Sequence, residues 1–301
     1  MSQPGFEPIL AHILPAERLV FASPIVCAGL FRCAPDDPHF AGGAPCSSHC
    51  IVFPREAAWI QHEGARRFLA DASMATMYNQ GQVYYRWSID NRPDRCDWLA
   101  FPGSIIRQAV QSWSVDDAGH ERHPLRFGAA PIAAGLYAAQ RRFFTSLERR
   151  IASDTLAIEE TALWLLDEVV ASAYSSRRVR TDAPRRSQRA ADAVEIARLT
   201  LARDPAARIP LASLGSLAGV SPFHLCREFR RHTGTTISAY RIGLRLRASL
   251  EPVAAGQDLT TIALGLGFTS HSHFTHAFRR AFGAVPSTAR GKSRPERFGR
   301  S

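Results

Sequence analysis

The sequence contains no run of eighteen apolar residues that is free of charge, and a membrane-spanning helix needs such a run. Residues 1–10 also lack the basic segment followed by an apolar one that is typical of a signal peptide. We therefore expect a protein of the cytoplasm that does not have a membrane as a partner.

Cysteine is scarce as well, with six in 301 residues. This number is too low for a secreted disulfide scaffold, so reduced thiols are expected. One group of soft ligands lies close together in the sequence, namely Cys27, Cys33, His39, Cys46, His49 and Cys50. Their spacing matches no tight C-x-x-C pair, which favours ordinary packing residues. The alternative is a metal- or thiol-responsive regulator that uses Cys33, Cys46 and Cys50.

The excess of positive charge lies in the last part of the chain. Residues 1–176 have a net balance of −4, whereas residues 177–301 hold 22 Lys+Arg and 8 Asp+Glu, a balance of +14. A concentrated basic excess beside a mildly acidic remainder is typical of a polyanion-binding module attached to another domain. A basic surface that serves only solubility is the alternative at this point.

Residues 1–130 contain short apolar runs broken by Gly, Pro and Asp. The runs are 49–53, 57–62, 74–78, 83–87 and 97–101. Their spacing of roughly ten residues predicts a mainly β domain, either a sandwich or a small barrel. Six aromatics alternate within these runs, and we expect some of them to point into the core or the barrel mouth: Trp59, Tyr78, Tyr84, Tyr85, Trp87 and Trp98.

The pattern then changes to helical spacing. Residues 131–150 and 154–174 are rich in Ala, Leu, Arg and Glu and predict two helices. We thus predict an α+β protein of two domains, in which a mainly β domain with two helices precedes an all-α domain. The predicted limits are an effector or dimerisation domain at 1–174, a polar linker at 175–188, the all-α domain at 189–290 and a basic tail at 291–301.

A repeat dominates the all-α part. The segment SPFHLCREFRRHTG (221–234) recurs as SHSHFTHAFRRAFG (270–283), with matching residues 49 positions apart. In each copy a Ser can cap the start of a helix, apolar residues at i and i+4 can anchor it, and a Gly can end it. Chance rarely keeps such a register.

A shorter helix is predicted upstream of each copy, at 211–218 and at 259–266. A short helix, a tight turn containing Gly and a capped second helix make a helix-turn-helix, which occurs here twice. Gly215 and Ala263 are the small residues where the two helices of each unit approach. Residues 237–250 predict a long amphipathic helix that holds the two units at a fixed separation.

The second helix of each unit can enter the major groove of DNA, where exposed side chains reach base edges. With Leu225, Phe229, Phe274 and Phe278 directed inward, the candidate DNA contacts are Pro222, Phe223, Cys226, Arg227, Arg230, Arg231, His271, Ser272, Thr275, His276, Arg279 and Arg280. Arg227 is the best candidate for a bidentate contact to guanine. The other four arginines are expected to bind phosphates.

These motifs identify a resemblance. Residues 189–290 resemble the DNA-binding domain of AraC/XylS-type regulators, through LASLGSLAGVSPFHLCREF, the spacer pattern Tyr240, Arg245, Leu246 and Ala248, GFTSHSHFTHAFRR and a closing GAVP. The chain departs from the family pattern at Gly215, Pro252 and Ala289. The resemblance implies DNA binding near promoters, contact with RNA polymerase, and a cupin-like N-terminal arm that senses an effector or dimerises.

No catalytic pattern accompanies these motifs. Metal-binding cupins need a His-x-His cluster with a downstream Glu and a further His, which the histidines of the N-terminal half do not reproduce: His39, His49, His62, His120 and His123. A nucleophile elbow for Ser or Cys is also missing. We therefore predict no enzyme, no cofactor and no metal. The leading hypothesis is a transcription factor that binds double-stranded promoter DNA and is modulated by a small-molecule effector or by homodimer formation.

Overall fold

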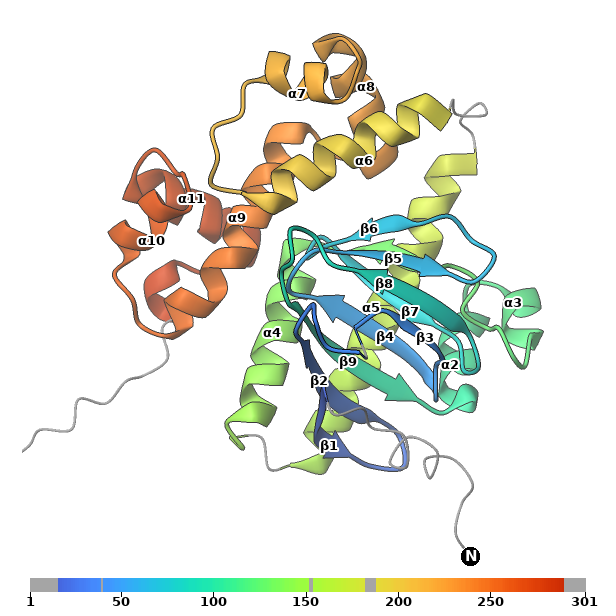
Figure 1. Cartoon of the computed structure of the whole chain (residues 1–301). Coiled ribbons are helices and arrows are strands. Elements are labelled where there is room, and N and C mark those ends of the chain that lie inside the picture. Colours follow the sequence, from blue (N-terminus) through green and yellow to red (C-terminus); the bar gives the residue numbers. More distant parts are fainter. Residues whose placement is uncertain (1–15, 39, 152–153, 182–187, 290–301) are drawn as a thin grey trace, which may run out of the picture.

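The computed structural model describes residues 16–38, 40–151, 154–181 and 188–289. The predicted basic tail at 291–301 and His39 therefore lie outside the described residues. Figure 1 shows an N-terminal part of two sheets flanked by helices, and a C-terminal part that is entirely helical, in agreement with the predicted α+β organisation. In the described part of the chain, no helix is long and apolar enough to cross a membrane.

Two antiparallel sheets form the N-terminal domain. The larger has the order β1 (Glu17–Ala22), β2 (Cys27–Cys33), β9 (Asp94–Phe101), β4 (His49–Pro54), β7 (Met74–Tyr78) and β10 (Ala129–Pro131). The smaller has the order β3 (Gly42–Pro45), β8 (Val83–Trp87), β5 (Ala58–His62) and β6 (Phe68–Ala70). Each of the five apolar runs predicted as strands corresponds to a strand to within one residue, which confirms the mainly β domain.

The larger sheet is buried on both faces. In β4 and β9, Ile51 and Leu99 pack with the helices, whereas their neighbours Val52 and Trp98 lie between the two sheets. Successive side chains of a strand point to opposite faces, so residues adjacent in sequence contact different parts of the molecule. This alternation becomes important where the sheet meets the C-terminal domain.

In the described part of the domain, four helices accompany the sheets: α2 (Gly103–Gln111), α3 (Val115–Gly119), α4 (Ala134–Glu148) and α5 (Thr155–Thr181). α4 and α5 are the two predicted helices. The sequence reading missed α2 and α3, which lie between β9 and β10. Ile106 and Val110 of α2, four residues apart, are fully buried, but two turns of helix give a weak periodic signal.

The C-terminal domain contains α6 (Gln188–Arg203), α7 (Leu211–Leu217), α8 (Pro222–Thr233), α9 (Ile237–Ala254), α10 (Leu259–Gly265), α11 (His271–Phe282) and η1 (Pro286–Ala289). We name α7 with α8 unit 1, and α10 with α11 unit 2. They lie at opposite ends of α9, as the predicted spacer requires (Figure 1). Unit 1 and α6 share one core, and unit 2 has a second.

Two boundaries differ from the sequence prediction. α5 continues to Thr181 and so occupies the first part of the predicted linker, while residues 182–187 lie outside the described residues. α9 continues to Ala254, past the predicted end at residue 250. Pro252 lies in its last turn, where its carbonyl oxygen accepts from the Gln257 N–H at 3.1 Å. The proline therefore does not end the helix.

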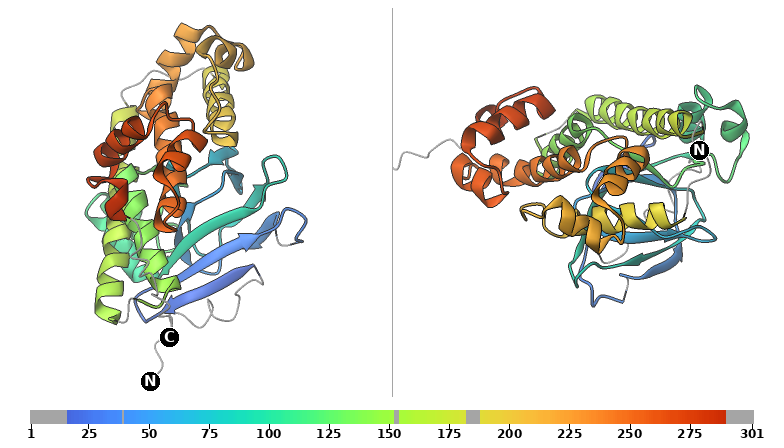
Figure 2. Two further views of the ribbon diagram at one scale, coloured as in Figure 1. Left: turned by 90° about the vertical axis from the view of Figure 1, so that its left-hand side faces the viewer. Right: turned by 90° about the horizontal axis from the view of Figure 1, so that it is seen from above.

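The two domains are in contact. α9 packs beside α4, α6 lies against β6, and α11 also contacts α4 (Figure 2). Polar and charged groups at these contacts are largely buried, among them Asp71, Arg198 and Arg247.

Candidate nucleic-acid interface and inter-sheet pocket

Helix α8 is capped at both ends by groups that the sequence predicted. The Ser221 hydroxyl accepts a hydrogen bond from the His224 N–H at 3.2 Å, and Pro222 occupies the first turn. At the other end Gly234 has φ +75°, and its N–H donates to the Arg230 carbonyl oxygen at 2.9 Å. A glycine suits this left-handed position because it has no Cβ.

Helix α11 repeats this arrangement 49 residues later. The Ser270 hydroxyl accepts from the His273 N–H at 3.1 Å. Gly283 has φ +74°, and its N–H donates to the Arg279 carbonyl oxygen at 2.8 Å. The repeated register therefore corresponds to two helices that begin and end in the same way.

Each of the two helices has one buried side and one exposed side. Leu225 and Phe229 of α8 and Phe274 and Phe278 of α11 are almost completely buried, as predicted. The opposite sides present the predicted DNA contacts: Pro222, Phe223, Cys226, Arg227, Arg230, His271, Ser272, His276, Arg279 and Arg280 are exposed, and Arg231 and Thr275 are half-buried. Phe223 is 78 % exposed, which is unusual for a large aromatic residue.

A buried carboxylate in α8 organises its basic residues, and the sequence reading missed it. Glu228 accepts from Arg227 Nε and Arg231 Nη1, each at 3.3 Å, and His232 Nδ1 lies 4.0 Å away. Burial raises the pKa of Glu228, but Arg231 and Arg227 outweigh this effect and hold it below its usual value. The spacing of Glu228 and Arg231, three residues apart on a helix, was the available signal.

Arg245 of α9 contacts both the loop before unit 1 and the turn of unit 2. Its guanidinium donates to the carbonyl oxygens of Pro205 at 2.5 Å, Ala206 at 3.0 Å and Gly267 at 2.7 Å. The first two belong to the loop between α6 and α7, and the third to the turn of unit 2. Burial lowers the pKa of Arg245, which nevertheless stays charged at neutral pH. A buried cation thus joins α9 to the loop that precedes unit 1 and to the turn of unit 2.

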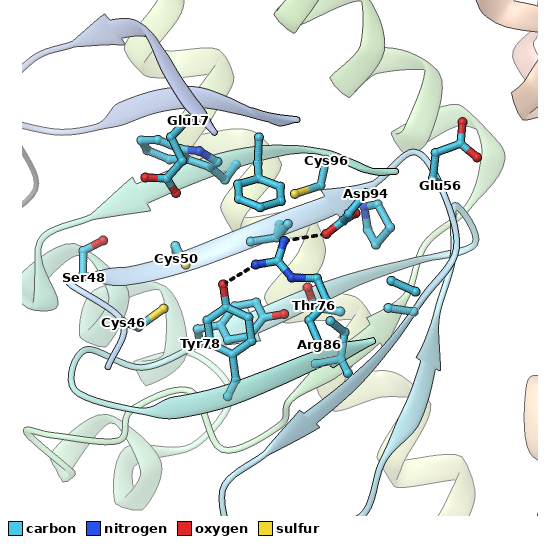
Figure 3. Close-up of a pocket in the computed structure, with 18 of the residues that line it drawn as sticks. Glu17, Cys46, Ser48, Cys50, Glu56, Thr76, Tyr78, Arg86, Asp94 and Cys96 are labelled. Atoms are coloured by element: carbon cyan, nitrogen blue, oxygen red, sulfur yellow. Dashed lines mark hydrogen bonds and ion pairs between the residues drawn. The ribbon is translucent and has the colours of Figure 1, made fainter. Parts of the chain in front are cut away.

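A second candidate site is a pocket of about 810 Å³, including its open mouth, between the two sheets (Figure 3). Its aromatic walls are Phe31, Tyr78, Tyr84 and Trp98. The predicted aromatic lining is therefore confirmed for Tyr78, Tyr84 and Trp98. Tyr85 and Trp87 of β8 lie instead on the surface, with exposed fractions of 40 % and 39 %.

The pocket contains one buried ion pair. Arg86 Nη1 donates to Asp94 Oδ2 at 2.6 Å (Figure 3). Arg86 Nη2 donates to the Tyr84 hydroxyl at 3.2 Å. The same guanidinium carbon lies 4.1 Å from the Phe31 ring centroid. Burial lowers the pKa of Arg86, but Tyr84 and Asp94 outweigh it, so the group stays protonated. Its charge is therefore neutralised within the wall.

The cysteines do not support the alternative sensor hypothesis. Cys46 and Cys50 line the pocket together with Cys96, whereas Cys33 does not. Burial raises the pKa of Cys33, and a hydrogen bond with Cys46 together with burial raises that of Cys50 well above its usual value. Buried thiols of this kind are poor nucleophiles because little thiolate forms. Within the described residues, no cluster of three or more His, Cys, Asp or Glu side chains could hold a metal ion.

The repeated segment is similar to segments of known proteins. Residues 214–292 match the family model of a helix-turn-helix domain. The chain is 40 % identical over 83 residues to the HTH-type transcriptional regulator GlxA of Rhizobium meliloti, a stretch that covers 27 % of this chain and 25 % of GlxA. It is also 40 % identical over 83 residues to the XylDLEGF operon transcriptional activator of Pseudomonas putida, covering 26 % of each chain.

The C-terminal domain resembles that of AraC/XylS-type regulators, as predicted from the sequence. The chain spans about a quarter of the length of the curated relatives that it matches, 25 % and 26 % for these two. Among solved structures, ToxT from Vibrio cholerae O395 covers 88 % of this chain and 97 % of its own, at 13 % identity and a TM-score of 0.35. A TM-score this low supports no conclusion about function. The caps, the turns and the buried phenylalanines of the AraC/XylS-type domain are those predicted from the sequence.

Proposed function

We propose that the chain is a sequence-specific DNA-binding transcription regulator that acts in the cytoplasm. The observation that carries the proposal is the pair of helices α8 and α11, which share caps and register and each present exposed arginines opposite a buried apolar side. A helix of this kind fits the major groove. Two such helices on one spacer can enter successive grooves, about 34 Å apart. The matched relatives are named as transcription regulators, in agreement with this proposal.

The contacts divide by chemistry. Arg227 lies in the second turn of α8, is 57 % exposed at its side chain, and is proposed to bind guanine. Arg230, Arg231, Arg279 and Arg280 lie near the ends of their helices and are proposed to bind phosphates. Phe223 is positioned for apolar contact with a thymine methyl group.

Selection of binding sites from a pool of random duplexes tests the proposal. The full chain should enrich a motif of two half-sites separated by about 10 base pairs. Binding to the enriched duplex should survive excess nonspecific competitor and weaken as salt rises. Enrichment of no sequence would contradict the proposal.

A matched control tests whether weaker DNA binding is specific to the proposed interface or follows the loss of any positive charge. Arg18 is exposed and pairs only at the surface with Glu148, at 2.9 Å, in the N-terminal domain. Arg18→Ala removes one positive charge, as Arg230→Ala does. We expect Arg230→Ala to weaken DNA binding and Arg18→Ala to leave it unchanged.

The N-terminal domain is proposed to adjust this binding. The aromatic walls of the inter-sheet pocket favour an apolar small-molecule effector. RNA polymerase at the promoter and a second copy of the chain are the further partners that we propose. Light scattering distinguishes a monomer of 33.1 kDa from a dimer of twice that mass.

A further inference from the structure

The strands that line the pocket also hold the C-terminal domain. Ala70, at the end of β6, lines the pocket, and the next residue, Asp71, is 1 % exposed at the domain contact. Asp71 accepts from Arg198 Nη2 of α6 at 2.9 Å and from the Tyr240 hydroxyl of α9. Arg198 Nη2 also donates to the Leu69 carbonyl oxygen at 3.0 Å. The end of β6 is thus bound to two helices of the DNA-binding domain.

At the turn between β4 and β5, residues that line the pocket again alternate with a residue of the domain contact. Pro54 and Glu56 line the pocket, while Arg55 between them forms an ion pair with Glu251 of α9. The Arg55 side chain is 6 % exposed, so this pair is protected from solvent on the arginine side. Burial, with Arg141 close by, lowers the pKa of Arg55 to about 10, and the group stays charged at neutral pH.

Strand β9 supplies a third example. Cys96 and Trp98 line the pocket, while Asp97 between them points to the helices and is completely buried. Asp97 pairs with Arg141 of α4 and lies 3.8 Å from Arg55. Arg141 in turn lies 3.7 Å from Glu251. Asp97, Arg55, Arg141 and Glu251 therefore form one charge cluster, which joins β9 to α9.

The residues of α9 in these contacts share one side of the helix. Tyr240, Arg247 and Glu251 are spaced by seven and four residues, which places them on one face. Arg247 Nη2 donates to the Ile132 carbonyl oxygen at 2.9 Å. The N-terminal domain thus holds α9 near its start, in its middle and near its end. Because α9 connects unit 1 to unit 2, these contacts set the orientation of both recognition helices.

We propose that the inter-sheet pocket binds an uncharged aromatic molecule, and that its occupancy changes DNA affinity through Asp71 and the Asp97–Arg55–Glu251 cluster. This rests on the proposed function. A ligand that moves a pocket-lining residue moves its neighbour in the strand, because the backbone is shared. Three independent strand segments connect the pocket to α6 and α9 in this way.

The chemistry of the walls selects the ligand class. Phe31, Tyr78, Tyr84 and Trp98 offer flat apolar surfaces. The positive charge of Arg86 is already matched by Asp94, and the two remaining charged groups of the lining are Glu17 and Glu56. An anion would therefore enter a site without a free cation in its described lining, whereas a neutral ring system faces no such cost.

Two fluorescent probes with the same ring system test the ligand class. N-phenyl-1-naphthylamine is neutral, and 8-anilino-1-naphthalenesulfonate adds one sulfonate. The full chain should bind the neutral probe at least about ten-fold more tightly than the anion. Ile60→Trp, which fills the pocket from β5, should remove this binding. Equal affinity for both probes, or binding that survives Ile60→Trp, would overturn the assignment.

The coupling is tested with the neutral probe and the selected duplex. In the wild type, saturation with N-phenyl-1-naphthylamine should change DNA affinity by about five-fold or more, and DNA should change probe affinity by the same factor. Asp71→Asn and Glu251→Gln should bring this factor close to one. Arg66→Ala is the control, because the Arg66–Asp192 pair also joins the domains but is exposed. Arg66→Ala should leave the coupling between probe affinity and DNA affinity unchanged.

A readout without DNA keeps this inference separate from the proposed function. Asp71→Asn and Glu251→Gln should each change probe affinity even when no DNA is present, whereas Arg66→Ala should not. If the chain binds no specific duplex but this shift occurs, the proposed function fails and the coupling stands. Unchanged probe affinity in both variants, or a wild-type DNA affinity that ignores bound probe, would overturn the coupling.

Discussion

Units 1 and 2 share their caps and their register but differ in what stabilises them. Helix α8 of unit 1 contains buried Glu228 with its basic partners, and unit 1 shares a core with α6, which is bound to the N-terminal domain by Arg198. Helix α11 has no acidic residue. Unit 2 instead contains a row of phenylalanine rings that pack tilted or edge-to-face, Phe268, Phe274, Phe278 and Phe282, with successive centroids 5.3, 5.6 and 4.5 Å apart.

This difference shows which features a helix-turn-helix repeat must keep. The caps, the turn glycine and the exposed arginines recur because they determine where the helix starts and what it presents. The core of each unit can be built from different apolar side chains, provided that they fill the space between its helices. Unit 1 is therefore joined to β6 of the N-terminal domain through the Arg198–Asp71 ion pair of its neighbour α6, whereas the interior of unit 2 depends on aromatic packing.

The largest effect is expected from truncating the core of each unit. Phe229→Ala and Phe278→Ala should each cost about 3–5 kcal/mol of unfolding free energy, measured by urea denaturation, because both side chains are completely buried. Only the first should loosen the domain contact at the end of β6. The Phe229 ring packs edge-on against Tyr240 at 5.3 Å, and Tyr240 donates to Asp71.

Amide hydrogen exchange in β6 distinguishes the two variants. Phe229→Ala should speed exchange at the end of β6, next to Asp71, whereas Phe278→Ala should leave it unchanged. Equal exchange rates at the end of β6 in the two variants would show that the core of unit 1 has no special influence on this contact.

The next largest effect concerns DNA. Arg227→Ala in unit 1 should cost about 1–3 kcal/mol of binding free energy and relax the preference at one base pair. Arg280→Ala in unit 2 should weaken binding to all sequences alike and reduce the salt slope by about one. Titration of single-base variants of the selected duplex, at several salt concentrations, measures both. Matching effects would show that our division into base and phosphate contacts is wrong.

A smaller effect is expected where the two helices of each unit approach. A Cβ on Gly215 would lie 2.9 Å from the Val220 carbonyl oxygen and 3.2 Å from the Pro222 nitrogen, so backbone would have to move. The cost of overpacking, about 1–3 kcal/mol, should exceed the gain of about 1 kcal/mol in helix propensity. Gly215→Ala should therefore lower stability in thermal denaturation, although alanine occupies the equivalent position 263 in unit 2.

Ala263→Gly is the reciprocal change in unit 2. Ala263 is completely buried, so its methyl group fills space, and its loss should cost about 1 kcal/mol through helix propensity alone. If Gly215→Ala instead stabilised unit 1, the departure from the family pattern would be a weakness and not a packing requirement.

The sequence predicted features that depend on neighbours in the chain. Caps at Ser221 and Ser270, the five apolar runs and the 49-residue register are all local or periodic signals. The domain contact has no such signal, because its partners are remote: Tyr240 and Asp71 are 169 residues apart, and Arg198 and Leu69 are 129 apart. Charge complementarity alone does not choose among the many Asp and Arg residues available.

The cysteines illustrate the same limit. Proximity in sequence grouped Cys33 with Cys46 and Cys50, but pairing of β4 with β9 brings Cys96 to the pocket instead. The aromatic runs were more informative, since alternation assigns every second residue to one face. It did not show which face was inside, so Tyr85 and Trp87 were grouped with the lining residues although they lie on the surface.

The smallest effect is a pH dependence of unit 1 that comes from Glu228. The pKa of Glu228 is lowered in the folded chain, so its contribution is present above the unfolded value of about 4.3 and is lost as pH falls through the folded value. Because Arg227 and Arg231 are partly exposed, Glu228→Gln should cost less than about 1 kcal/mol at pH 7. The difference in urea stability between wild type and variant should shrink from pH 5 to pH 3.5. A difference that stays constant would mean that Glu228 acts by packing and not by charge.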